Sequence, residues 1–179
     1  KLKIKIINTI LSQLADDDAK KVPSSFMLYG DTGSGKTSAI LTLIKTLGLK
    51  EYSFYGSDNK KAQSFFLSMS QIYEGSSTNP SSNMKGMFTT EEALAHLEAF
   101  LASEYEERGF IWLDDFHLAP PKTRAMFLNK IRSLLENKTF TVTLPSRSTR
   151  ERPTRNLTIG VTLNLTDNQS RIEKFMKRK

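Results

Sequence analysis

Several short segments of the chain carry apolar residues in continuous runs or in alternation with polar ones, which is the spacing of β-strands. A short apolar run bounded by glycine or polar residues is typical of a buried strand. Residues 140–144 alternate like a short strand or a hairpin arm. The predicted strands cover residues 26–29, 52–55, 110–113, 140–144 and 157–165.

Between these strands, apolar residues recur every three or four positions, which is the spacing of a helix with one buried side. Gly48 follows one such segment as a C-cap, and Thr89 with Glu92 forms the pattern of a capping box at the start of another. The predicted helices cover residues up to about 14, 40–47, 59–73, 89–107 and 121–135, and a further helical stretch opens at 171.

The alternation of strands and helices predicts an α/β fold, with a mostly parallel sheet and helices on both faces. Residues 75–86 are rich in Ser, Asn and Pro, so a loop is expected there. Residues 147–155 are polar and basic and are expected to form a turn. Trp112, the single tryptophan, is expected in the core, and His96 is expected at the surface.

Composition excludes several classes of protein. With 179 residues, of which 38% are hydrophobic, the chain is predicted to form one soluble domain with a sizeable core. The absence of cysteine and the presence of only two histidines exclude a disulfide framework and a zinc centre. No apolar run is long enough for a membrane span and no signal peptide is visible, so a cytoplasmic protein without a membrane partner is expected. Because the chain begins at Lys1, it is expected to be a piece of a longer chain.

The net charge of +7 is unevenly distributed. Residues 1–121 hold 12 basic and 15 acidic side chains, whereas residues 122–155 hold nine and two, and residues 171–179 hold five and one. Such a basic region is either a solvated surface or a contact site for nucleic acid, an acidic protein or the nucleotide of a neighbouring subunit. No aromatic residue interrupts the arginine run to stack on bases, and both interpretations stay open.

One segment carries a specific chemical signature. Residues 30–37 read Gly-Asp-Thr-Gly-Ser-Gly-Lys-Thr, which matches G-x-x-x-x-G-K-[ST] between a predicted strand and a predicted helix. The glycines let backbone N–H groups point inward at the helix start, where the helix dipole favours phosphate. Lys36 is expected to reach the β- and γ-phosphates, and the Thr37 hydroxyl to coordinate Mg²⁺. The predicted nucleotide-binding residues are Gly30, Asp31, Thr32, Gly33, Ser34, Gly35, Lys36, Thr37 and Ser38.

A second candidate segment is the apolar strand that ends in Asp114 and Asp115, with Asp114 lying 77 residues beyond Thr37. Asp114 is expected to hold Mg²⁺ through water, and Asp115 to polarise the attacking water. Alone, this pattern also fits a helix cap or an exposed turn. Combined with the loop, it predicts a site for ATP and Mg²⁺. ATP is favoured over GTP because residues 129–132 read Asn-Lys-Ile-Arg and lack the Asp of a guanine-reading motif.

The loop at 30–37, the strand at 110–115 and the later strand ending in Thr-Leu-Asn at 162–164 together resemble the ATPase core of AAA+ proteins. Residues 113–120 are similar to the pattern hydrophobic-Asp-Asp-hydrophobic-Asn-hydrophobic-Pro of dynein-type modules, with His117 in place of Asn and one extra residue, Ala119. The resemblance implies a three-layer P-loop NTPase fold, the large subdomain of an AAA+ module. Residues 1–179 are therefore interpreted as a single nucleotide-binding core, which would be cytoskeletal if dynein-like.

The resemblance implies two further catalytic residues. Asn164 is similar to the strand-end Asn that positions the lytic water, although an Asn here also fits a cap of the following turn. Arg171 is similar to the arginine that reaches the γ-phosphate bound by a neighbouring subunit, although an arginine in a basic tail is often only solvated. Neighbouring AAA+ modules or subunits in a ring are the implied partners. His117 is expected to pack and hydrogen-bond beside Asp115.

Two departures from the family pattern bear on activity. Many active members end the acidic strand in Asp-Glu, and Asp115 is one methylene shorter, so slow hydrolysis or none is an alternative. The family's helical lid has no counterpart before Lys179, so it is either omitted or provided by another chain.

Three hypotheses about function follow from these observations. The chain is an ATP-hydrolysing module of a ring-shaped motor or remodelling machine, an ATP-binding module with negligible turnover, or a nucleic-acid-linked ATPase such as an initiator or helicase loader.

Overall fold

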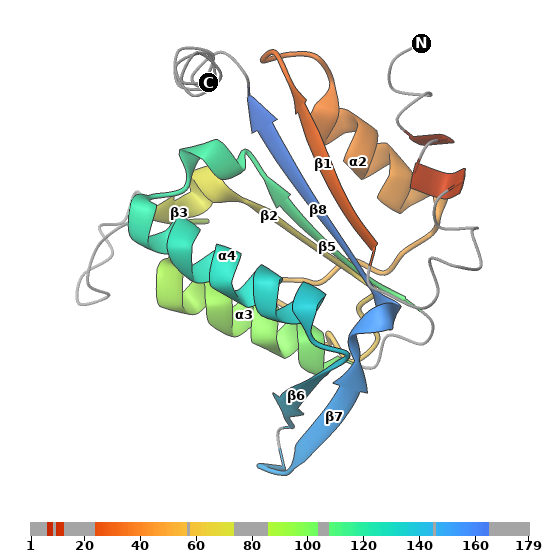
Figure 1. Cartoon of the computed structure of the whole chain (residues 1–179), viewed down its shortest axis with the longest axis vertical. Coiled ribbons are helices and arrows are strands. Elements are labelled where there is room, and N and C mark those ends of the chain that lie inside the picture. The colour runs from red at the N-terminus through yellow and green to blue at the C-terminus, as the bar shows by residue number, and fades with distance from the viewer. Residues whose placement is uncertain are drawn as a thin grey trace, which may run out of the picture.

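The computed structural model describes residues 7–8, 10–12, 24–56, 58–73, 86–103, 108–144 and 146–164. Its centre is a four-stranded parallel sheet in the order β1-β8-β5-β2 (Figure 1). These strands are β1 (Ser24–Gly30), β2 (Ser64–Ser68), β5 (Gly109–Asp114) and β8 (Leu157–Asn164). Because all four are parallel, their carboxyl ends meet at one edge of the sheet, which we call the carboxyl edge. Gly30 pairs there with Asn164, and Ser68 with Asp114.

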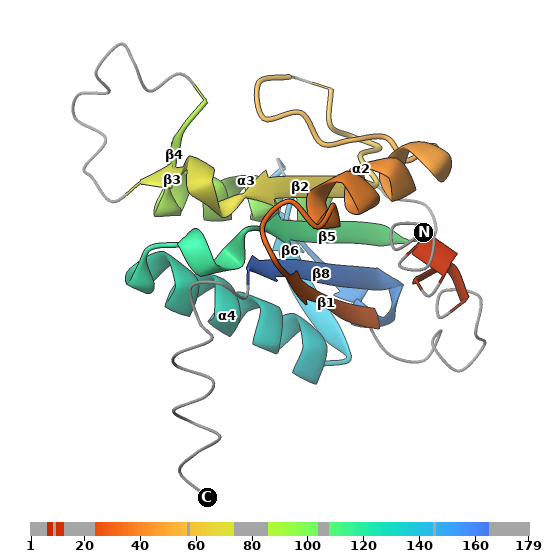
Figure 2. The same cartoon turned by 90° about the horizontal axis from the view of Figure 1, so that it is seen from above.

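Helices cover both faces of the sheet, as the sequence predicts. Helix α2 (Lys36–Thr46) and the helical residues at 7–8 and 10–12 pack on one face, and α3 (Thr90–Ala102) and α4 (Pro121–Glu136) pack on the other. Figure 2 shows α2 and α4 on opposite sides of the strands. The predicted helix up to about residue 14 is confirmed for the described residues in that stretch. Within the described residues, no helix combines the length and apolar character needed to span a bilayer.

A hydrophobic core lies on each face of the sheet, and strand β5 contributes to both. All six of its residues are buried. Phe110 and Trp112 pack with Ile40, Leu43 and Ile44 of α2, whereas the alternate residues of β5 join the core under α3 and α4. The core position expected for Trp112 is confirmed. Its ring also explains a glycine on the neighbouring strand, since a Cβ atom at Gly160 would lie 1.8 Å from a ring carbon of Trp112.

The helix predicted over residues 59–73 is wrong. This segment contains β2, a 3₁₀ turn η2 (Met69–Gln71) and β3 (Ile72–Tyr73), and β3 pairs with β4 (Phe88–Thr89). Phe65 and Leu67 pack in the core under α3 and α4, and Phe66 packs in the core under α2. A strand buried on both faces has a continuous apolar run, and in a short segment such a run cannot be told from helical spacing.

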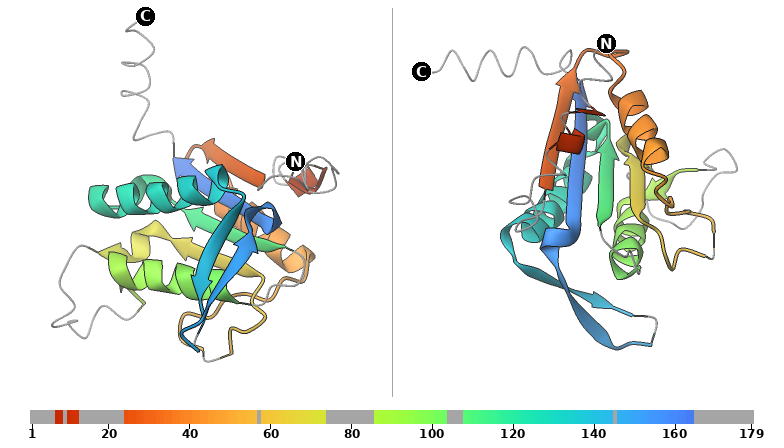
Figure 3. Two further views of the ribbon diagram at one scale, coloured as in Figure 1. Left: turned by 60° about the horizontal axis from the view of Figure 1, so that its bottom comes forward. Right: turned by 90° about the vertical axis from the view of Figure 1, so that its right-hand side faces the viewer.

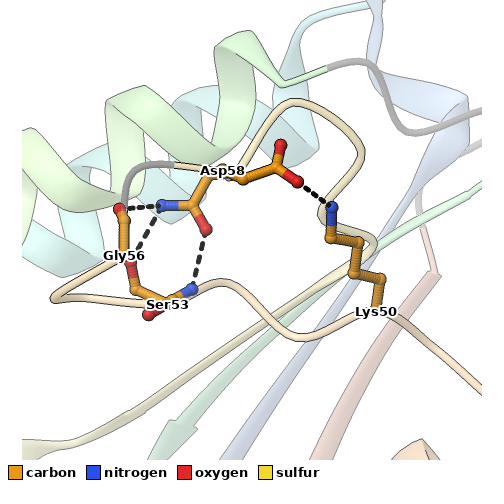
Figure 4. Close-up of polar contacts among 5 residues, drawn as sticks. Lys50, Ser53, Gly56 and Asp58 are labelled. Atoms are coloured by element: carbon orange, nitrogen blue, oxygen red, sulfur yellow. Dashed lines mark hydrogen bonds and ion pairs between the residues drawn. The ribbon is translucent and has the colours of Figure 1, made fainter.

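The strand predicted over residues 52–55 is also wrong, because this segment is a loop that closes on itself. The side chain of Asn59 accepts a hydrogen bond from the Ser53 N–H at 2.8 Å and donates one to the Ser53 carbonyl at 2.8 Å. Lys50 and Asp58 form an ion pair at 3.3 Å across the same loop (Figure 4). The segment touches the sheet only at the start of β2, where Glu51 forms an isolated bridge with Ser64 and the Tyr52 N–H donates to the Ser64 carbonyl at 2.7 Å. The Tyr52 side chain is buried in the core.

Helix α3 begins at the predicted capping box. The Thr89 N–H donates to the Glu92 carboxylate at 2.7 Å, and the Glu92 N–H donates to the Thr89 hydroxyl at 3.2 Å. The helix ends at Ala102 rather than near 107, and residues 104–107 lie outside the described part. The surface position expected for His96 is wrong, because its ring is half-buried and its Nδ1 lies 3.0 Å from the Tyr52 hydroxyl.

A β-hairpin projects from the end of the sheet opposite the carboxyl edge (Figures 1 and 3). Its strands are β6 (Thr139–Thr143) and β7 (Thr149–Pro153), and the 3₁₀ turn η4 (Thr154–Asn156) joins β7 to the start of β8. The hairpin arm predicted at 140–144 is confirmed. The turn predicted over 147–155 is only partly right, because residues 149–153 pair with β6 as a strand.

Candidate active site

The loop between β1 and α2 has the backbone conformation that its glycines predict. Gly33 and Gly35 have φ angles of +79° and +88°, a region that glycine enters without steric cost. Gly35 is the N-cap of α2 and provides no capping side chain, and the first turn of the helix carries no acidic residue. The N-terminal N–H groups of α2 therefore meet no competing carboxylate of their own helix, which favours an anionic ligand.

Lys36 lies inside the curve of this loop and is largely buried. Its ammonium donates to the carbonyl oxygens of Gly30 and Asp31 at 3.0 and 2.9 Å and to the Ser34 hydroxyl at 3.2 Å. Three loop oxygens thus take up the three donors of the ammonium group. The predicted loop residues Asp31, Thr32, Gly33, Ser34 and Ser38 are exposed at the carboxyl edge.

The structure brings together Thr37 and Asp114, which the sequence predicts as metal ligands. The Thr37 hydroxyl lies 2.9 Å from both carboxylate oxygens of Asp114, and Asp114 is buried. A hydroxyl and a carboxylate are the oxygen donors that a hard cation such as Mg²⁺ requires. Thr37 lies in the first turn of α2, which follows β1, and Asp114 ends β5, so the two residues come from segments that β8 separates in the sheet.

Thr162 on β8 joins the two aspartates, and sequence reasoning missed it. Its hydroxyl donates to an Asp114 carboxylate oxygen at 2.6 Å and accepts the Asp115 N–H at 2.8 Å. The side chain is completely buried, and a buried carboxylate requires hydrogen-bond partners of this kind. The signal in the sequence was a threonine at an inward position of a strand, two residues before Asn164.

Asp115 differs from Asp114 in its backbone and its surroundings. Its φ angle is +51°, a left-handed conformation that costs a non-glycine residue about 1 kcal/mol. The turn starts the 3₁₀ helix η3 (Phe116–Leu118), in which the Leu118 N–H donates to the Asp115 carbonyl at 2.8 Å. The carboxylate of Asp115 is only half-buried and has no hydrogen-bond partner among the described residues. It is therefore able to meet a ligand or a water.

His117 hydrogen-bonds beside Asp115, as expected, and its partner is Asn164. The Asn164 N–H donates to Nδ1 of His117 at 3.3 Å, and the side-chain amide nitrogen of Asn164 lies 3.4 Å from Nε2. Arg124 stabilises the turn that carries His117, because its guanidinium donates to the carbonyls of His117 and Ala119 at 3.0 and 3.1 Å.

The carboxyl edge therefore gathers Lys36 and Thr37 from the start of α2, Asp114 and Asp115 from the end of β5, and Asn164 from the end of β8. Arg171, which is predicted to reach the γ-phosphate bound by a neighbouring subunit, lies outside the described residues.

Comparison with known proteins agrees with this arrangement. A family profile described as an AAA domain matches residues 19–150, which include the loop and the acidic strand. A comparison with curated proteins found no match. The chain belongs to the AAA domain family, whose members are P-loop ATPase domains, and its three-layer α/β fold is that of P-loop NTPases.

Proposed function

We propose that this chain is the Mg²⁺·ATP-hydrolysing core of an AAA module that works in a ring-shaped motor or remodelling machine. The observation that carries the proposal is the cluster of Thr37, Asp114 and Thr162, which is joined by hydrogen bonds of 2.6 to 2.9 Å beside the phosphate-binding loop. A buried carboxylate and a hydroxyl beside a lysine-lined loop are the groups that a magnesium nucleotide site uses.

The residues present fit Mg²⁺ bound together with a nucleotide. The described residues contain no group of three or more His, Cys, Asp or Glu side chains that could hold a metal ion by themselves. Mg²⁺ is commonly held by one or two protein oxygens together with phosphate oxygens and waters, so Thr37 and Asp114 would be sufficient. Bound Mg²⁺ would offset the negative charge of the phosphates, and Lys36 would contribute to the same effect.

In this proposal the remaining site residues act on water and on the neighbouring subunit. Asp115 would orient the attacking water, because its carboxylate is half-buried and has no partner among the described residues. Asn164 would position the same water from the end of β8, next to the start of the phosphate-binding loop. Arg171 would reach the γ-phosphate of a neighbouring module, which makes a ring the functional unit.

The test of the catalytic proposal is phosphate release by the full chain with ATP, GTP or no nucleotide. Lys36→Ala is expected to weaken ATP binding and abolish turnover. Asp115→Asn is expected to keep binding and lower turnover by about 100-fold or more, as for loss of a group that acts on the water. Lys45→Ala is the matched control, because Lys45 is exposed in the last turn of the same helix. Turnover that survives Lys36→Ala would contradict the proposal.

The ring is tested by mixing two inactive variants. Arg171→Ala removes the arginine that would act on a neighbour but keeps its own nucleotide site. Lys36→Ala inactivates its own nucleotide site but keeps Arg171. If Arg171 acts on a neighbour, the mixture recovers part of the ATPase activity that each variant lacks alone. No recovery in an assembly that contains both variants, with size checked by light scattering, would contradict action between subunits.

A second candidate function is that of an ATP-binding module with negligible turnover. The observation that favours it is Asp115, which is one methylene shorter than a glutamate at the same position. Tight binding of ATP without phosphate release, in an assembled ring, would favour this function over hydrolysis. The narrower likeness to dynein-type modules rests on residues 113–120, which form the end of β5, η3 and the N-cap of α4. A long chain with several such modules in a row would support it.

A further inference from the structure

The β6–β7 hairpin and its two flanking turns, residues 138–155, form a projection that we call the hairpin arm. Its base is firmly attached to the domain. Val142 is buried in the core next to α3, and the Arg152 guanidinium donates to the carbonyls of Leu101 (3.1 Å) and Ser103 at the end of α3. Thr154 donates to the Asn137 carbonyl at 2.6 Å. The arm is therefore a separate two-stranded sheet that these contacts hold against the end of α3 and α4.

The two halves of the basic region differ in whether their cations have partners within the domain. The basic side chains of α4 are already engaged. Lys122, Lys130 and Arg132 form ion pairs with Glu91, Glu98 and Glu136, respectively, and Arg124 binds the η3 carbonyls. The positive charge expected over 122–155 is thus largely neutralised or used internally in its first half.

The hairpin arm keeps its charge. It holds five basic side chains and one acidic one, and the acidic one, Glu151, accepts a hydrogen bond from Thr139 on the opposite strand. Four basic residues of the arm are exposed and form no ion pair within the described part of the chain: Lys138, Arg147, Arg150 and Arg155.

The chemistry of the tip fits phosphate groups better than a protein surface. Arg147 stands in the turn at a φ of +62°, between Ser146 and Ser148, and threonines flank the turn on both strands. Guanidinium and hydroxyl groups are the usual partners of nucleic-acid phosphates. The large exposed apolar residues of the described chain all lie outside the arm, so the arm lacks the apolar anchors that dominate most protein interfaces.

The shape of the arm favours a double helix over a single strand. A two-stranded antiparallel ribbon fits the major groove of duplex DNA. Single strands are usually bound by aromatic side chains that stack on bases, and the arm presents none at its exposed tip. We propose that the hairpin arm binds the phosphate backbone of duplex nucleic acid, without reading its sequence, at the end of the domain opposite the phosphate-binding loop. The proposal does not depend on ATP hydrolysis.

The test measures binding of the full chain to a fluorescent duplex DNA of mixed sequence by anisotropy, over a range of salt concentrations. Contacts from the four exposed cations predict a log–log slope against salt of about −3.6 from the arm, because each phosphate contact contributes about −0.9. Arg147→Gln with Arg150→Gln is expected to reduce the steepness by about 1.8 and to weaken binding roughly 50-fold at about 0.1 M salt. Lys138→Gln with Arg155→Gln, at the base of the arm, is expected to give a similar change.

The matched control is Lys122→Gln with Arg132→Gln, which removes the same charge from ion-paired positions on α4 and is expected to leave the slope unchanged. The basic residues 171–179 are common to all variants, so they do not contribute to the differences. A control that weakens binding as much as the arm variants would overturn the proposal. So would tighter binding to single-stranded DNA, or binding to polyglutamate as strong as binding to the duplex, because the partner would then be a different polyanion.

Discussion

The two ends of the central sheet differ in the burial and the hydrogen bonding of their charged side chains. At the carboxyl edge, Lys36 and Asp114 are buried, and their hydrogen bonds to the loop and to the two threonines are 2.6 to 3.2 Å long. At the hairpin end, Arg147 and Arg150 are exposed and form no ion pair within the described residues. A charge that is buried needs partners to offset its loss of hydration, whereas an exposed charge can keep water until a partner displaces it.

The contrast separates charges that set geometry from charges that can attract a ligand. Removal of a paired, buried group leaves its partners unsatisfied and is expected to affect both stability and site geometry. Removal of an exposed arginine is expected to affect only what the arginine binds. Arg152 shows that sequence position does not decide this, because it lies on the arm yet is bound to the end of α3.

Both ends depend on the sheet that joins them. The largest expected loss of stability therefore comes from a substitution within that sheet. Gly160→Ala would place a methyl group within 2 Å of the buried Trp112 ring. Such overpacking is expected to lower the free energy of unfolding by about 3 kcal/mol. Urea denaturation measures the loss, and Trp112→Phe in the same chain is expected to restore part of it. Unchanged stability of Gly160→Ala would mean that the two strands do not lie in this register.

At the carboxyl edge, Thr162→Val keeps the shape of the side chain but removes both of its hydrogen bonds. It is expected to cost about 1 to 3 kcal/mol of stability, because the Asp115 N–H and the Asp114 carboxylate each lose a partner. If the proposed function is right, ATP turnover also falls by about 10-fold or more. Thr162→Ser is the conservative control and should retain most of both properties. An active Thr162→Val protein would show that the threonine only fills space.

At the hairpin end, two arginines separated by one residue are expected to behave differently. Arg152→Ala removes the hydrogen bonds to the end of α3 and is expected to cost about 1 kcal/mol. Arg150→Ala is expected to change stability by less than about 0.5 kcal/mol, because the side chain is exposed and unpaired among the described residues. Thermal or urea unfolding of the two variants distinguishes them. Equal losses would imply that the whole arm, and not Arg152 alone, holds α3.

His96 is partly buried, so it lies between the buried charges of the carboxyl edge and the exposed charges of the arm. Its substitution is expected to have the smallest effect, on the pH dependence of stability. Burial lowers its pKa below the usual 6.5, and a hydrogen-bonding contact with Tyr52 holds the ring. The folded chain therefore binds fewer protons than the unfolded chain, so stability is full above about pH 6.5 and is lost as the pH falls through the lowered pKa. The unfolding free energy of His96→Phe should depend less on pH in that window. A slope unchanged by the substitution would assign the effect to other groups.

Much of the site could be predicted from sequence because its parts are local. The phosphate-binding loop needs only glycines at the right spacing, and its conformation at Gly33 and Gly35 follows from the freedom of those residues. The acidic end of β5 and the capping box of α3 are likewise contained within a few residues. The contact of His117 with Asn164 could not be predicted, because it joins two segments that only the sheet brings together.

By itself, the sequence determined the alternation of strands and helices, the loop that suits a phosphate group and the carboxylates that suit a cation. The tertiary structure alone decided that residues 64–68 are a strand, because a position beside β5 buries both faces of that segment and overrides its helical spacing. It also decided which charges are partnered. Pairing depends on distances between elements far apart in the chain. The sequence places nine basic residues over 122–155, but only the folded structure shows that those of α4 have partners whereas most of those of the arm form no ion pair among the described residues.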